Sequence, residues 1–148
     1  MDYTEILKEI YEEIQPYAQM GKPASYIPEL LKVNPDRYGI CLRTIEGKEY
    51  AQGDSDERFA IQSISKVFTL AMVVRHMGGD LWKYVGREPS GTPFNSLVQL
   101  EHEQGIPRNP FINAGALVVT DKVMNLYHRP KEAILQFVRS VAGNDDIY

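Results

Sequence analysis

The sequence predicts an α/β fold of the α+β kind, in which one helix and one β-hairpin precede a run of helices. Three observations lead to this prediction. Apolar residues in the segment 3–17 recur at helical spacing, residues 38–52 alternate as strands do, and residues 64–77 are apolar on almost every side. A lone two-stranded hairpin is only marginally stable. We therefore expect strands outside these 148 residues to complete the sheet.

The first elements have recognisable boundaries. Asp2 and Glu5 form a capping-box pattern at the start of the first helix, and Pro16 either ends or kinks that helix. The prolines within residues 22–37 predict a loop that contains at most a short helical turn. The predicted hairpin consists of a strand in residues 38–45, a turn at Glu46 and Gly47, and a returning strand in residues 48–52.

The helices that follow are bounded by glycines, a proline and capping residues. The helix of residues 64–77 is expected in a domain interior because it has almost no polar face, and Gly78 is expected to end it. The predicted helix starts further along are a cap at Asp80, a capping box at Ser96 and Gln99, a cap at Asn113, and a first-turn proline at Pro130.

Composition excludes several functional classes. The chain has 16 Lys or Arg and 20 Asp or Glu, a net charge of −4, so a nucleic-acid partner is not expected. The single cysteine, Cys41, excludes an internal disulfide framework, and no apolar run approaches the length of a membrane span. The acidic start lacks an apolar signal core, so we expect a soluble cytoplasmic protein without membrane contact.

The strongest candidate for chemistry is the pair Ser63 and Lys66 at the start of the apolar helix. Their spacing places both side chains on one face of its first turn. The N–H groups and dipole at a helix N-terminus stabilise charge that develops on a serine oxygen. Lys66 is the only charged residue in the segment 59–74, and a lysine among apolar neighbours loses proton affinity. It could then take the Ser63 proton, provided that Ser63 Oγ and Lys66 Nζ share a hydrogen bond.

A purely structural interpretation stays open at this point. Ser63 could be an N-cap, and Lys66 could extend its stem along apolar surface with its amine in water. Asn109 and Asn113 are each either a cap or turn former, or an amide that binds a substrate carboxylate or carbonyl. The three histidines have no ligand spacing, so no metal site is predicted; they are His76, His102 and His128.

Three longer motifs point to a family. They are Gln-Ser-Ile-Ser-Lys at 62–66, Pro-Ser-Gly-Thr-Pro-Phe-Asn-Ser at 89–96, and Gly-Ile-Pro-Arg-Asn-Pro-Phe-Ile-Asn-Ala-Gly-Ala at 105–116. With these motifs the chain resembles bacterial glutaminase, the serine-dependent kind with a β-lactamase-like fold. The resemblance runs from about Gly21 to Tyr148, and the 105–116 block is its most specific part.

The resemblance implies an activity and a set of site residues. It implies hydrolysis of the side-chain amide of L-glutamine to L-glutamate and ammonia, without a cofactor or metal. Ser63 would be the nucleophile and Lys66 the base, and the backbone N–H of Ser63 would form half of an oxyanion hole. The implied substrate-binding residues are Tyr26, Gln62, Ser63 and Asn113. Family members are commonly tetramers, so a homo-oligomer is expected.

Members of this family continue well beyond the position of Tyr148. We therefore expect residues 1–148 to be the N-terminal portion of a glutaminase domain, with the first helix and two strands in residues 1–62. Residues 63–148 would hold the nucleophile helix and a helical subdomain. Further binding residues and strands would lie in the remainder, so we do not expect these 148 residues to be active alone.

Two other hypotheses stay open. One is a Ser-x-x-Lys acyl-transfer enzyme of the penicillin-recognising kind, which the 105–116 block disfavours. The other is a catalytically inactive truncated half, which predicts exposed apolar surface where the missing strands would pack.

Overall fold

The structure is a computed structural model that describes residues 2–18, 20–91, 100–101 and 103–148. The chain divides into two compact units, Met1–Ala60 and Ile61–Tyr148, and each is described by itself. The predicted division after residue 62 lies close to this boundary, and its assignment to parts of a glutaminase domain stays a prediction. The predicted capping box at Ser96 and Gln99 lies outside the described residues.

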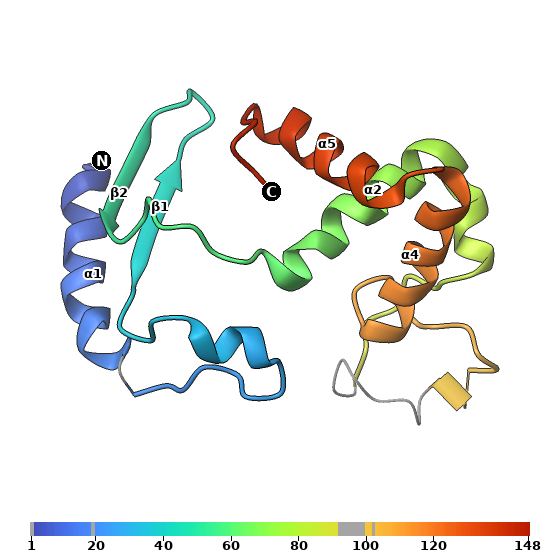
Figure 1. The fold of residues 1–148 in the computed structure, drawn as a ribbon, viewed down its shortest axis with the longest axis horizontal. Coiled ribbons are helices and arrows are strands. Elements are labelled where there is room, and N and C mark those ends of the chain that lie inside the picture. Colours follow the sequence, from blue (N-terminus) through green and yellow to red (C-terminus); the bar gives the residue numbers. More distant parts are fainter. Residues whose placement is uncertain (1, 19, 92–99, 102) are drawn as a thin grey trace. The chain divides into compact units, whose positions relative to one another are not determined.

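The first unit begins with helix α1, which spans Tyr3–Ala18 (Figure 1). The Asp2 carboxylate caps this helix by accepting hydrogen bonds from the N–H groups of Thr4 at 3.0 Å and Glu5 at 3.4 Å. Pro16 lies inside α1 and does not end it. The predicted cap of the first helix is thus confirmed.

The predicted hairpin follows α1. Strands β1 (Gly39–Arg43) and β2 (Glu49–Gly53) pair in antiparallel fashion and are the only strands in the described part of the chain. Helix α1 contacts both strands, and the ring of Tyr11 stacks on that of Tyr38 with 5.4 Å between centroids. The loop before the hairpin contains one 3-10 turn, η1 (Pro28–Lys32), as its prolines predict.

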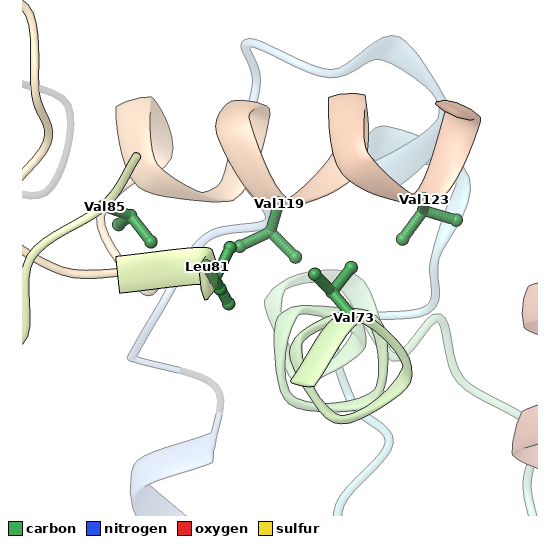
Figure 2. Close-up of a cluster of buried hydrophobic side chains, with 5 residues drawn as sticks. All are labelled: Val73, Leu81, Val85, Val119 and Val123. Carbon is green, nitrogen blue, oxygen red and sulfur yellow. The ribbon is translucent and has the colours of Figure 1, made fainter. Parts of the chain in front are cut away.

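The described residues of the second unit form helices and connecting loops. Its elements are η2 (Gln62–Ile64), α2 (Ser65–Met77), η3 (Gly78–Lys83), α4 (Asn113–Leu126) and α5 (Pro130–Ala142). Helix α2 contacts η3, α4 and α5. Figure 2 shows the apolar core of this unit, whose side chains are at most 1% exposed: Val73, Leu81, Val85, Val119 and Val123. Each buried side chain of this kind stabilises the fold by about 1.5–3 kcal/mol.

Several predicted helix boundaries are confirmed. Gly78 ends α2 with φ +52° and Gly143 ends α5 with φ +60°, a backbone region that favours glycine. Pro130 lies in the first turn of α5. The predicted cap at Asp80 is wrong, because η3 begins at Gly78 and Asp80 lies inside it; its carboxylate accepts a hydrogen bond from Lys83 Nζ at 2.6 Å. This contact lowers the pKa of Asp80 below its ordinary value.

The interior position expected for α2 is met on only one side by the described residues. Val67 is 53% exposed and Val74 is 37% exposed. The physical reason is that the other elements of this unit bury Val73, Met72 and Thr69 on one side of α2 and leave the opposite side uncovered. This uncovered side is exposed apolar surface of the kind that the truncated-half hypothesis predicts.

Helices long and apolar enough to cross a membrane are absent from the residues described above.

Candidate active site

Ser63 lies on the short turn η2, directly before α2. The sequence places it in the first turn of the helix, and the structure corrects this position, because the α-helix begins only at Ser65. The hydroxyl of Ser65 donates a hydrogen bond to the backbone oxygen of Gln62, which joins η2 to the helix start. Ser63 itself is exposed.

The backbone before Ser63 has an unusual conformation. Gln62 has φ +41°, in the left-handed region that disfavours side chains with a Cβ. Such a residue costs about 1–3 kcal/mol, and residues of this kind cluster at functional sites. Among the residues that the structure describes, the N–H of Ser63 has no backbone acceptor. It is therefore available to donate to an oxyanion, which is the role predicted for it.

Lys66 links α2 to the turn that precedes α4. Its Nζ donates hydrogen bonds to the backbone oxygen of Phe111 at 2.9 Å and to Asn113 Oδ1 at 2.8 Å. Both acceptors are neutral oxygens, and no ion pair of Lys66 occurs within the described segments. The sequence predicts apolar neighbours for this amine. In the structure Lys66 is half-buried, and its amine makes two polar contacts.

The hydrogen bond expected between Ser63 Oγ and Lys66 Nζ is not formed in the described part of the chain. The amine points instead to the oxygens of Phe111 and Asn113. In enzymes without bound substrate, catalytic hydrogen bonds are often long and shorten only in the substrate complex. The pairing of Ser63 with Lys66 stays a prediction that rests on their spacing.

The two asparagines around Pro110 have different roles. Asn113 begins α4, but no side chain caps that helix, so its predicted capping role is wrong. Asn109 makes the turn instead, because its Oδ1 accepts hydrogen bonds from the N–H groups of Phe111 at 3.0 Å and Ile112 at 3.1 Å. The amide of Asn113 is thereby left to contact Lys66.

Among the predicted site residues, four belong to the second unit: Gln62, Ser63, Lys66 and Asn113. Tyr26 belongs to the first unit, just before η1, and is 78% exposed. Its active-site role stays a prediction. The backbone oxygen of Phe111 is a site atom that the sequence does not reveal, because any residue type supplies a carbonyl there.

The described residues include no group of His, Cys, Asp or Glu that could hold a metal ion. The ring of His76 makes contacts within the fold. Its Nδ1 lies 2.9 Å from the backbone oxygen of Met72, and the ring of Tyr127 packs edge-on against the His76 ring.

Comparison with known proteins gives a consistent result. A family model described as Glutaminase matches residues 21–148. A glutaminase of Rhizobium etli (strain CIAT 652) is 56% identical over an alignment 149 residues long that covers 99% of this chain and 48% of that relative. A glutaminase of Christiangramia forsetii is 53% identical over 148 residues, covering 100% of this chain and 49% of that relative. The chain thus spans about half the length of the curated relatives it matches.

Solved structures of similar proteins share the fold. The protein Mglu in its tris and glutamate form superimposes with a TM-score of 0.81 at 33% identity, over 96% of this chain and 32% of that chain. The probable glutaminase ybaS superimposes with a TM-score of 0.72 at 33% identity, over 86% of this chain and 45% of that chain. The predicted α+β fold of the β-lactamase-like kind is therefore confirmed.

Proposed function

Because the chain belongs to the glutaminase family, we propose that the full-length protein hydrolyses the side-chain amide of L-glutamine to L-glutamate and ammonia. The observation that carries the mechanism is the pair of oxygens around Lys66 Nζ, those of Phe111 and Asn113. A neutral amine has two N–H groups and one lone pair. If the two oxygens accept both N–H groups, the lone pair remains for the Ser63 proton.

The proposed reaction has two stages. Lys66 takes the hydroxyl proton of Ser63 while Ser63 Oγ forms a bond to the amide carbon of glutamine. The backbone N–H of Ser63 donates to the oxyanion that forms. Lys66 then returns the proton to the nitrogen, the carbon–nitrogen bond breaks, and ammonia leaves an acyl-enzyme on Ser63. Water then attacks the acyl carbon, the carbon–Oγ bond breaks, and a proton from the water returns to Ser63 Oγ as glutamate leaves. We propose that Gln62 and Tyr26 line the substrate pocket, as the resemblance to the family implies.

The test of this function is an assay of the full-length protein with L-glutamine. We expect ammonia and L-glutamate to form in equal amounts, and a fluorescent penicillin to leave Ser63 unlabelled. Labelling by the penicillin without glutamine turnover would support the penicillin-recognising alternative. Absence of both reactions in a folded full-length protein would contradict an acyl-transfer function altogether.

Asn113→Ala is expected to raise the KM for glutamine about tenfold. Asn113 Oδ1 accepts a hydrogen bond from Lys66 Nζ, so the Asn113 NH2 group is left to donate to the substrate. A smaller fall in kcat should accompany the change, because Lys66 loses one of its two acceptors.

Steady-state kinetics of the full-length protein measure both constants. The control is Asn125→Ala, an exposed position on the same helix. An unchanged KM in Asn113→Ala would show that Asn113 does not bind the substrate.

We also propose that the protein is cytoplasmic and homo-oligomeric; the second property is one that the resemblance to the family implies. Light scattering coupled to size-exclusion chromatography of the full-length protein measures its assembly, and a monomeric mass would contradict the second of them. Cell fractionation measures its location.

A further inference from the structure

We infer that Asn109 is a positioning residue for Lys66, an inference that rests on the proposed function. The evidence begins with the hydrogen bonds of its side-chain amide. Oδ1 accepts from the N–H groups of Phe111 at 3.0 Å and Ile112 at 3.1 Å, and Nδ2 donates to the backbone oxygen of Glu88 at 2.9 Å. The amide thus fixes one turn of backbone and ties that turn to a second segment.

The turn that Asn109 fixes carries the acceptors of Lys66. Phe111, whose N–H is held by Asn109, presents its carbonyl oxygen to Lys66 Nζ at 2.9 Å. Asn113, which follows the turn as the first residue of α4, presents its Oδ1 to the same amine at 2.8 Å. A displacement of the turn would therefore move both oxygens away from Lys66.

The second segment gives the turn a fixed support. The N–H of Gly86 donates to the backbone oxygen of Pro107 at 2.7 Å, and the N–H of Glu88 donates to that of Arg108 at 2.9 Å. The amide of Asn109 continues this ladder with its own bond to Glu88. The segment before the turn is thus held by three successive hydrogen bonds.

Helix α4 supports the turn from the other side. A Cβ atom placed on Gly115 would lie only 1.9 Å from the backbone oxygen of Asn109, so the turn lies directly against this helix. Only glycine permits so close an approach.

These contacts also decide between the two roles that the sequence leaves open for Asn109. A substrate-binding amide must have a donor or an acceptor directed at the ligand. Oδ1 of Asn109 accepts two backbone N–H groups, and Nδ2 donates to a backbone oxygen, which leaves a single N–H of the amide. The amide is thereby committed to the turn, and we expect it to act on the reaction through Lys66.

The test compares Asn109→Ala with Asn109→Asp in the full-length protein. Asn109→Ala should lower kcat for glutamine by about 10- to 100-fold, because both acceptors of the base are displaced. It should raise KM by less than Asn113→Ala does, because the Asn113 amide is still present although its position is less well fixed. Asn109→Asp keeps both acceptor contacts to Phe111 and Ile112 but replaces the donor to the Glu88 oxygen, so it should recover part of the lost kcat. The thermal unfolding midpoint of each variant should confirm that the variant is folded.

The matched control is Asn144→Ala. Asn144 makes the same kind of turn, since its Oδ1 accepts the N–H of Asp146 at 2.8 Å, but its hydrogen bonds within the described residues do not reach the 109–113 turn. Its kcat should stay within about twofold of the wild type. A kcat of folded Asn109→Ala within about threefold of the wild type would overturn the inference, as would an Asn109→Asp variant no more active than Asn109→Ala.

A crystal structure separates this inference from the proposed function. A wild-type protein without glutamine turnover would contradict the function alone. In that case the positions of the Phe111 and Asn113 oxygens in Asn109→Ala decide the inference. Loss of both hydrogen bonds to Lys66 Nζ would support it, and retention of both would overturn it.

Discussion

Ser63→Ala in the full-length protein is expected to abolish release of ammonia from L-glutamine, a loss of at least about 10³-fold. Without Oγ no acyl-enzyme forms, and water alone is a poor nucleophile toward an amide. The substitution removes one oxygen from an exposed turn, so glutamine binding should be largely retained. Coupled detection of ammonia measures turnover, and isothermal calorimetry measures binding.

The control for this variant is Ser140→Ala, an exposed serine on α5. It should leave turnover unchanged. Substantial turnover in a folded Ser63→Ala protein would refute Ser63 as the nucleophile. Loss of glutamine binding together with turnover would point to a structural role for η2 in the substrate pocket.

Lys66→Met is expected to slow acylation by about 10²- to 10⁴-fold, the usual contribution of a general base. Methionine has a similar length but no basic nitrogen to take the Ser63 proton and no donor for the oxygens of Phe111 and Asn113. Rapid-quench measurement of the first ammonia released reports acylation directly. A fall of only a few-fold would show that another group takes the proton.

Lys66→Arg tests whether Lys66 acts through its basicity or through its positive charge. A guanidinium stays protonated, so it preserves a positive charge without accepting a proton. We expect it to be nearly as slow as Lys66→Met. Recovery of most of the acylation rate would show that charge is what matters and would contradict the base assignment. Lys131→Met, at an exposed position on α5, is the control for loss of a lysine.

Features set by local chemistry could be predicted from the sequence. The Asp2 carboxylate caps α1 because its oxygen reaches N–H groups only a few residues away. Gly143 ends α5 because the left-handed backbone conformation at that position favours glycine. The hairpin turn likewise follows from its own residues. None of these needs knowledge of distant parts of the chain.

The candidate site was less predictable because it depends on contacts between distant segments. Which of two asparagines shapes the turn before α4 depends on where Glu88 lies, and spacing does not encode that position. The oxygen of Phe111 at Lys66 is a backbone atom that any residue type would supply. The burial of α2 similarly depends on which elements cover it, and those described here cover one side.

The two oxygens that accept hydrogen bonds from Lys66 are uncharged, and this determines how its contacts respond to salt. Dissolved ions weaken the attraction between exposed charges of opposite sign over a distance of about 8–10 Å at ordinary ionic strength. A short contact between an amine and a carbonyl or amide dipole is far less sensitive to such screening. The arrangement of the Phe111 oxygen, Asn113 and Lys66 should therefore persist in concentrated salt that would dissociate an exposed ion pair.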